Sequence, residues 1–246
     1  MKLFKKGLLL PTVLGLVFVL GGCVSSDDVA ETILGTVNVS GTIVDASNND
    51  AALQDVSVQA TTDGIPGTTN NYDSSTVNTD VSGNFSLSVA KDLPVYLRLN
   101  KTNYATFNSA FTSFSADTNV GEIPMITTAD AEFVIDAAFP TSGLDLAGKA
   151  WLIVEVYDAA GDDLAGVTIA PSNAPTESAY NNLVDCTNDY SAAGPTIDCT
   201  ATRVGPMYIA YYDADELIDV SITGAASGSQ AALVRMGEVA VVVFEQ

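Results

Sequence analysis

Histidine, the side chain that enzymes use most often for proton transfer, is absent from this 246-residue chain. Its absence excludes Ser-His-Asp triads, Cys-His pairs and every His-ligated metal site. Carboxylates remain, and two acidic clusters invite a calcium interpretation: Asp158/Asp162/Asp163 and Asp213/Asp215/Glu216. Calcium requires six to eight oxygen ligands, often in a glycine-containing loop, and these clusters are also typical of turns. We therefore favour solvated turn acids and expect no metal, no cofactor and no catalytic residue.

Tyrosines form a second candidate site. Tyr96 and Tyr208 occupy similar places in two similar segments, and strand parity directs them away from the inward apolar residues, as it does Tyr212. Outward tyrosines could form a flat stacking surface for a sugar or a partner strand. Packing within the fold is the competing interpretation, and we favour it. Trp151 is also outward by parity, with burial against the preceding linker as the alternative.

Net charge limits the partners. The chain has nine Lys and Arg against 30 Asp and Glu, a formal charge of −21. Nucleic-acid binding requires a clustered basic surface, so nucleic acid is excluded as a partner.

The N-terminus has the features of an export signal. Lys2, Lys5 and Lys6 precede a short apolar run that reaches Gly22. The boundary Leu20-Gly21-Gly22-Cys23 resembles the lipobox of bacterial lipoproteins, which implies removal of residues 1–22 and acylation of Cys23. An uncleaved signal anchor is the alternative. Residues 23–35 form an acidic tether. Val24 favours the outer membrane if the source is Gram-negative, on its periplasmic or surface face.

The other two cysteines are Cys186 and Cys199, which flank the turn signal Gly194-Pro195. An exported chain meets oxidising conditions, so we expect a disulfide across a hairpin. A redox or metal pair is the alternative, but the chain has no Cys-x-x-Cys spacing.

The two halves of the chain contain similar blocks. Val44-Asp45, Leu53 and Val56–Val58 resemble Tyr157-Asp158, Leu164 and Val167–Ile169. The segments around Tyr96 and Tyr208 match next, and Gly121-Glu122 and Gly237-Glu238 close each copy. Alternating apolar residues predict half-buried strands in every block. We expect two tandem modules, residues 36–126 and 148–246.

The first module resembles the carboxypeptidase regulatory-like domain. The resemblance rests on Gly41-Thr42-Ile43-Val44-Asp45, Leu53-Gln54-Asp55-Val56-Ser57-Val58 and Thr79-Asp80-Val81-Ser82-Gly83-Asn84-Phe85. It implies a transthyretin-like (prealbumin-like) β-sandwich and a non-catalytic accessory role. The second module departs from the pattern at Gly194-Pro195, so its membership rests on the repeat. The predicted fold is all-β, with two tandem transthyretin-like, Ig-like sandwiches.

Residues 127–147 link the modules. Ala131, Val134, Ile135 and Ala138 have helical spacing, and Pro140 would end a helix. We expect a short helix that braces one module on the other.

Together these features predict a non-catalytic, lipid-anchored protein of the cell envelope that binds or scaffolds. Its partners would be the membrane, through the lipid, and an envelope protein or a glycan. A glycan-binding surface module and an accessory subunit of an exported hydrolase remain as alternatives.

The lipid anchor is directly testable. In a bacterial host that acylates lipoproteins, Cys23→Ser should abolish incorporation of radiolabelled palmitate and leave the unprocessed precursor, because the acylated thiol is gone. Cys186→Ser is the matched control and should leave labelling unchanged. Palmitate entering the Cys23→Ser chain would show that the anchor lies elsewhere.

Overall fold

The structure is a computed structural model that describes residues 35–63, 72–139, 143–159, 164, 167–181, 185–191, 194–201 and 207–245. Its elements are β1 (Thr36–Asp45), β2 (Ala51–Ala52), β3 (Ser57–Thr61), β4 (Val77–Asn78), β5 (Asn84–Ala90), β6 (Pro94–Asn100), β7 (Thr106–Ser109), β8 (Thr112–Ser113), β9 (Thr118–Met125), α2 (Thr128–Ala138), β10 (Ala150–Tyr157), β11 (Val167–Pro171), β12 (Glu177–Asn181), β13 (Asp185–Ser191), β14 (Gly194–Ala201), β15 (Met207–Tyr212), β16 (Glu216–Gly224), β17 (Gly228–Val234) and β18 (Glu238–Glu245).

The first sandwich faces one small sheet with half of a large one. In the small sheet, β1 pairs antiparallel with β2 and β5 and parallel with β9. Opposite it lie β4, β3, β6 and β7, with β8 paired to β6. Alternation in β5 sends Phe85, Leu87 and Val89 into the core between the sheets and leaves the residues between them exposed.

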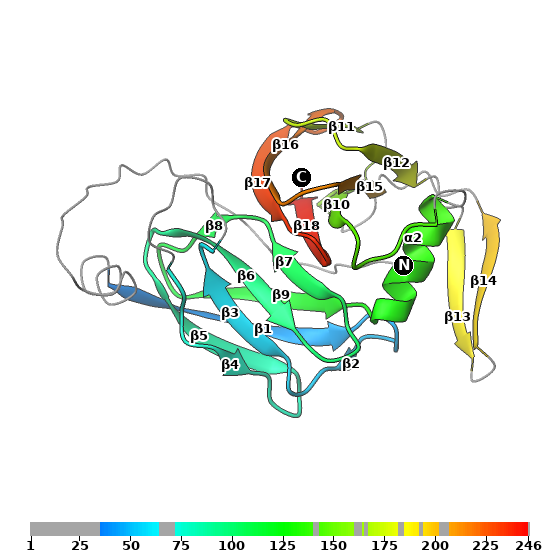
Figure 1. The fold of residues 1–246 in the computed structure, drawn as a ribbon. Helices are drawn as coiled ribbons and strands as arrows, with labels where there is room; N and C mark the ends of the chain where they lie inside the picture. Colours follow the sequence, from blue (N-terminus) through cyan, green and yellow to red (C-terminus); the bar gives the residue numbers. More distant parts are fainter. Residues whose placement is uncertain are drawn as a thin grey trace.

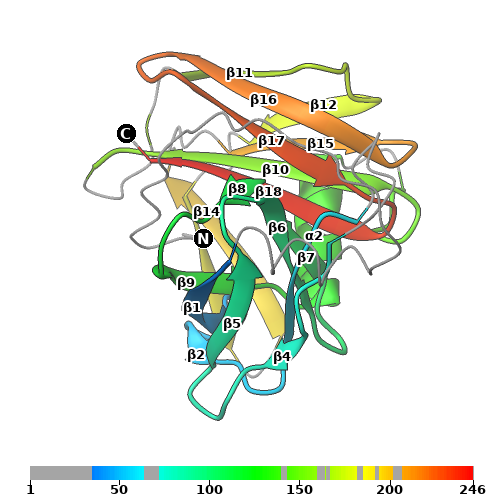
Figure 2. The same cartoon turned by 90° about the vertical axis from the view of Figure 1, so that its left-hand side faces the viewer.

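The second sandwich uses the other half of the same large sheet, in the order β12-β15-β10-β18. A three-stranded sheet, β11-β16-β17, covers one face of that half (Figure 1). The halves meet where β18 pairs in parallel with β7, from Glu238 opposite Thr106 to Val241 opposite Ser109. A single nine-stranded sheet thus runs through both sandwiches, and Figure 2 shows its strands between the sheet that contains β1 and β5 and the sheet of β11, β16 and β17. The expected all-β fold with two sandwiches and a helical linker is confirmed.

The strand pairing supports the internal repeat at the start of each copy. In both, the first strand pairs in parallel with the last, β1 with β9 and β10 with β18. The Leu53 amide donates to Ile43 O at 2.9 Å, and the Leu164 amide donates to Val156 O at 3.0 Å. These bonds join equivalent positions in the two copies. Leu53 and Leu164 therefore hold the same place in the fold.

The later part of the expected repeat is wrong. The segments around Tyr96 and Tyr208 are β6 and β15, which are not equivalent strands. β6 pairs with β3, whereas β15 pairs with β10, as β5 pairs with β1. The second copy inserts the hairpin β13–β14 before β15, and this extra length gave the mismatched segments similar spacing. The Gly-Glu pairs are also offset, because Glu122 lies within β9 and Glu238 begins β18.

Three strands are not half-buried as the alternation predicted. β10, β15 and β18 bury residues on both faces of the large sheet. One face packs with β11, β16 and β17, and the other belongs to the core of the first sandwich. Near-continuous apolar sequence is typical of strands covered on both sides.

The linker helix forms as expected. Thr127 is the N-cap, and its hydroxyl accepts from the Asp130 amide at 3.2 Å. The four residues with helical spacing all pack on the core of the first sandwich. α2 ends one residue before its C-cap, Phe139, and Pro140 lies outside the described residues. The helix thus covers part of the large sheet between the two sandwiches.

Gly83 gives a test of the β4–β5 turn. Its φ is +75°, and a Cβ there would lie 2.4 Å from the carbonyl oxygen of Ile43. Gly83→Ala should lower the free energy of unfolding by about 1–3 kcal/mol, because both the backbone and the contact become strained. Urea denaturation measures the change.

Val81→Ala is the matched control in the same turn. Val81 is 75% exposed, so its truncation should change the free energy of unfolding by less than about 0.5 kcal/mol. Equal effects of the two substitutions would contradict the close approach of Gly83 to β1.

Candidate functional site at the junction of the sandwiches

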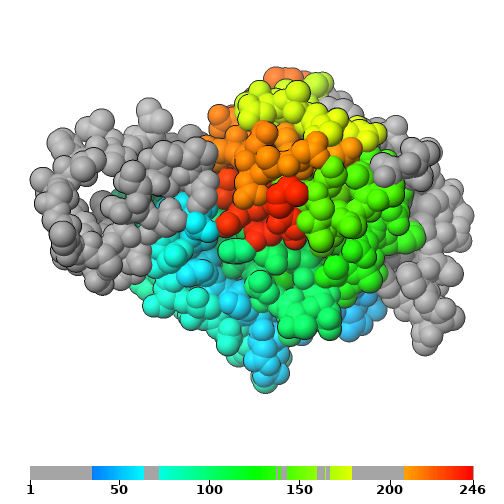
Figure 3. Space-filling view, viewed as in Figure 1, coloured from blue at the N-terminus to red at the C-terminus, as the bar shows by residue number. Residues whose placement is uncertain are grey.

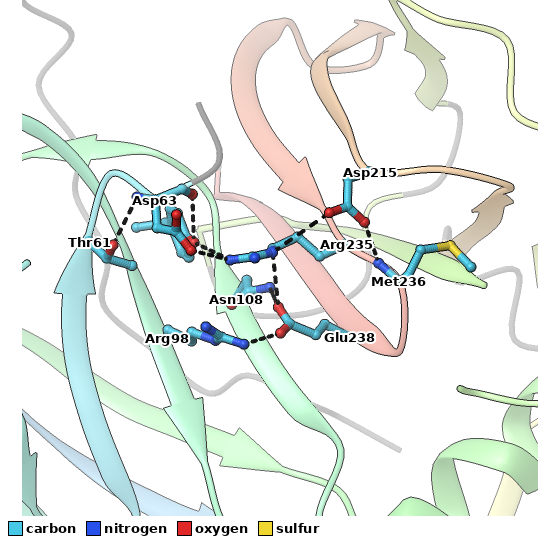
Figure 4. Close-up of polar contacts among 9 residues, drawn as sticks. Thr61, Asp63, Arg98, Asn108, Asp215, Arg235, Met236 and Glu238 are labelled. Carbon is cyan, nitrogen blue, oxygen red and sulfur yellow. Dashed lines mark hydrogen bonds and ion pairs between the residues drawn. The ribbon is translucent and has the colours of Figure 1, made fainter. Parts of the chain in front are cut away.

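A polar cluster lies where the two sandwiches join. Glu238, the first residue of β18, is 8% exposed. It forms an ion pair with Arg98 of β6 and accepts a hydrogen bond from Asn108 Nδ2 of β7 at 2.7 Å. Arg98 and Asn108 are directly opposite each other in the β6–β7 ladder, so both side chains converge on one carboxylate (Figure 4). The second sandwich therefore supplies the anion, and the first supplies its donors.

Arg235 extends the cluster from the turn between β17 and β18. Its Nη1 donates to Asp63 Oδ2 at 2.8 Å and lies 3.4 Å from the Tyr96 hydroxyl, both in the first sandwich. Its Nε is 4.0 Å from Asp215 and from Glu238. Burial opposes the charge of Arg235, but hydrogen bonds to Asp63 and Tyr96 raise its pKa above the ordinary value. The guanidinium remains charged and ties the two sandwiches together.

The cluster joins the two sandwiches through ion pairs and hydrogen bonds. Two guanidinium groups face three carboxylates, so most of the negative charge in the cluster is compensated. Among buried polar atoms of the described side chains, Arg98 Nε and Asn108 Oδ1 have no hydrogen-bond partner. None of the cluster residues is a nucleophile of the Ser, Thr or Cys type.

A second polar group lies just before the start of β10, the same end of that strand as Glu238. Lys149 forms an ion pair with Asp213, and its Nζ lies 5.1 Å from the centre of the Tyr211 ring. The hydrogen bond from Lys149, followed by one from Thr176, lowers the pKa of the Asp213 carboxyl. This pair is more exposed than the junction cluster and joins β10 to the end of β15.

The acids of the calcium interpretation have separate partners where they are described. Asp215 Oδ1 accepts from the Met236 amide at 2.7 Å, and Glu216 accepts from Asn173 at 3.0 Å, so neither joins Asp213 around a common point. Asp162 and Asp163 lie outside the described residues. Within the described part of the chain, no three Asp, Glu or Cys side chains are grouped to hold a metal ion.

The favoured interpretation of the tyrosines, packing within the fold, is confirmed, and the alternative of an exposed tyrosine surface is wrong. Tyr96, Tyr208 and Tyr212 are 0%, 3% and 2% exposed. Tyr96 donates to Asp63 O at 2.9 Å, and burial raises the pKa of both Tyr96 and Tyr212. Tyr208 and Tyr212 point into the core of the second sandwich itself, and Ile209, which was taken as inward, faces the core of the first, so parity assigned the wrong face of β15 as the outer one. These three tyrosines are therefore not exposed to stack on a sugar.

Burial of Trp151 against the linker is confirmed. Trp151 is 1% exposed, and its ring lies 6.0 Å from Phe139 and 5.5 Å from Tyr211, centre to centre. Its indole nitrogen donates to Leu146 O at 3.3 Å. The aromatic cluster fastens α2 and the linker to the large sheet.

The motif residues that carry the family resemblance stabilise local structure. The Thr79 hydroxyl donates to Leu53 O at 2.6 Å and accepts from the Val56 amide at 2.9 Å. Asp80 Oδ1 accepts from the Ser82 and Asn84 amides, both at 2.9 Å, and these bonds close the turn before β5. The motif thus specifies a strand connection and forms no binding site.

The cysteines are only partly within the described structure. Cys23, the predicted signal segment and residues 24–34 of the tether lie outside it. Cys186 and Cys199 are direct partners in the antiparallel β13–β14 ladder. Opposite residues in such a ladder have Cα atoms about 4.5–5.5 Å apart, which lies within the range for a disulfide. The disulfide stays a prediction, because only the backbone of these strands is described.

Within the described ranges, no helix has the length and apolar character needed to span a bilayer.

Comparison with known proteins gives distant likenesses only. No family model matches the chain, and no curated protein does. Among solved structures, a chain of a type II cohesin–X-dockerin complex from Acetivibrio cellulolyticus is 24% identical over 36% of this chain, with a TM-score of 0.27. The shaft pilin spaA of Lactobacillus rhamnosus GG is 10% identical over 85% of this chain and 97% of its own, with a TM-score of 0.26.

The Bacillus anthracis TIE protein is 8% identical over 86% of this chain and 33% of its own, with a TM-score of 0.28. The match covers 56% and 58% of the first two cohesin–dockerin chains, so this chain spans little more than half of their length. The fold assignment rests on the strand pairing itself.

The sequence did not reveal the junction residues. Arg98 lies at a polar place in an apolar strand, where a solvent-facing residue is the ordinary expectation. Glu238 precedes the apolar run Val239–Phe244. This run was the one available sign of the junction, because a strand that is apolar on both faces must be covered on both faces. Nothing in the sequence paired Glu238 with Arg98.

The ion pair at the junction can be tested by removing its buried anion. Glu238→Gln should lower the free energy of unfolding by about 1–3 kcal/mol, because Arg98 then lacks its partner. Asp213→Asn breaks the more exposed pair with Lys149 and should cost much less. Urea denaturation followed by Trp151 fluorescence measures both.

The double variant Arg98→Met/Glu238→Gln separates the pair from its surroundings. Coupled residues give a double variant that is less destabilised than the sum of the single changes. Strict additivity would show that Arg98 and Glu238 contribute independently.

Proposed function

We propose that this chain is an exported, non-catalytic binding or scaffolding protein, attached to the cell envelope by a lipid on Cys23. The observation that carries the proposal is the β13–β14 hairpin, which pairs with no other strand of the described structure. The hairpin is an insertion that the sandwich does not need for its own sheets. An arm whose strands pair with neither sandwich is best explained by contact with another molecule.

The β13–β14 arm and the beginning of β1 lie at opposite ends of the described structure. In Figure 1, the blue beginning of β1 is at the left, and the yellow β13–β14 arm is at the right, beside α2. The proposed tether joins the beginning of β1. If it is flexible, it reaches roughly 20 Å. The body would therefore hold the arm on the side away from the membrane.

The charge of the arm defines the kind of partner. Residues 185–201 contain Asp185, Asp189 and Asp198 and no Lys or Arg. Elsewhere, Arg98, Lys149 and Arg235 are already engaged in internal ion pairs. Removal of the signal would leave six basic against 30 acidic residues, a net charge of −24. A basic envelope protein fits this surface, and the contact should weaken with salt.

The finer assignments belong to the same proposal. The Cys186–Cys199 disulfide would fix the arm across its ladder and limit its conformational freedom. Membership of the carboxypeptidase regulatory-like group is supported by the motif around Gly83, and the proposed module limits stay at 36–126 and 148–246. An accessory subunit of an exported hydrolase is the second candidate, favoured by the same unpaired arm. The outer membrane is the proposed location in a Gram-negative organism.

A charge-matched comparison tests the arm. The variant Asp185→Asn/Asp189→Asn/Asp198→Asn removes three negative charges from the arm. The control Asp50→Asn/Glu132→Gln/Asp136→Asn removes three from exposed positions elsewhere. Lysozyme, a small basic protein, is the defined probe in a sedimentation or calorimetric titration, beside pull-down from the organism's own envelope.

The arm variant should weaken probe binding and lose the envelope partner at low salt, and the control should retain both. Reduction with dithiothreitol should weaken binding in the unmodified chain, because the arm loses its crosslink. Equal loss in the two triple variants would assign the effect to net charge alone and contradict a specific role for the arm.

A further inference from the structure

We infer that the two sandwiches fold and unfold as one cooperative unit, which the C-terminal strand β18 closes. Tandem sandwiches are ordinarily separate units with their own cores. Here the sheet is continuous, and single strands supply residues to both cores. The inference concerns the folding of the described body and does not depend on the proposed binding function.

β18 divides its side chains between the two cores. Val239 and Val241 belong to the core of the first sandwich. Ala240, Val242 and Phe244, which alternate with them, belong to the core of the second. Because successive side chains of a strand point to opposite faces, one strand completes both cores at once. In Figure 3, the red end of the chain lies at the seam between the orange upper part and the green lower part.

The neighbouring strands repeat this division. In β10, Trp151 is in the first core, and Leu152 and Val154 are in the second. In β15, Ile209 and Tyr211 are in the first core, and Ala210 is in the second. The first core therefore contains large side chains from strands that follow the linker in sequence. It would be left open if the second sandwich unfolded.

The dependence also runs the other way. Ala110, just after β7, packs against the core of the second sandwich. The Phe111 amide donates to Ala231 O of β17 at 2.8 Å, so the first sandwich covers part of a sheet edge of the second. β7 pairs with β6 along one edge and with β18 along the other. Unfolding the first sandwich would expose polar backbone groups of both β17 and β18.

Position in the chain gives β18 its special role. It lies between β10 and β7 and is parallel to both. Every described strand of the two sandwiches precedes it in sequence, yet neither core is complete without its residues. The stable fold therefore cannot form until β18 has been synthesised and has paired with β10 and β7.

Amide hydrogen exchange on the full chain tests the coupling. Ile218 of β16 is 0% exposed and belongs only to the second core. If the body is one unit, Ile218→Ala should accelerate exchange of the slowest amides by about 100-fold in β16, and by the same factor in β1 and β5 of the first sandwich. The reciprocal variant Val39→Ala, in the first core, should accelerate β16 and β17 together with β1.

Two further variants keep the test decisive. Ile218→Val removes a single methylene and leaves the chain folded if the alanine variant is too unstable, with an expected acceleration of about 5-fold in both sandwiches. Val81→Ala, at an exposed turn, should leave all rates unchanged. Faster exchange confined to β11, β16 and β17 after substitution of Ile218 would overturn the inference.

Discussion

The parallel pairing of β7 with β18 is the interaction on which the architecture depends. Four residue pairs join a strand from the first half of the chain to its last strand. Because hydrogen bonding continues from β7 to β18, two sheets that would otherwise end at open edges become one. The polar side chains at the same place, Arg98, Asn108 and Glu238, then lie between two apolar cores, where a carboxylate needs its donors close at hand. The linker helix and its aromatic cluster cover the sheet face that this continuity creates.

Local sequence was sufficient to predict the elements but not their layers. The alternation in β1 and β5, the turn at Gly83 and the spacing of Ala131 and Ile135 each depend on short-range rules, and each forms as expected. The outward direction expected for Tyr208 and Tyr212 was wrong, because parity separates the two faces of a strand but does not say which face meets the core of its own sandwich or what covers the other. Burial on both faces is a property of the assembled molecule. Its clearest sign was the unbroken apolar run at the C-terminus.

The distribution of charge follows from the same architecture. Acidic residues are abundant and occur in strands, in α2 and in turns, whereas basic residues are few. Both arginines of the described structure are at the junction of the sandwiches, and Lys149 is paired near its edge. Guanidinium groups suit this place, because one planar group donates in several directions at once. The scarce cations are thus used inside the molecule, and the exterior is left predominantly anionic.

The place of β1 in its sheet has a mechanical consequence. β1 lies between β5 and β9 and is hydrogen-bonded to both along most of its length. Tension applied to its first residue, along the strand, would load these two ladders in shear, so that many bonds must break together before the strand slips. A strand at the rim of a sheet, pulled sideways, would release its bonds one after another at much lower force. If the protein is held by its N-terminal end, the force therefore acts on β1, the strand whose two ladders best resist being pulled out of the sheet.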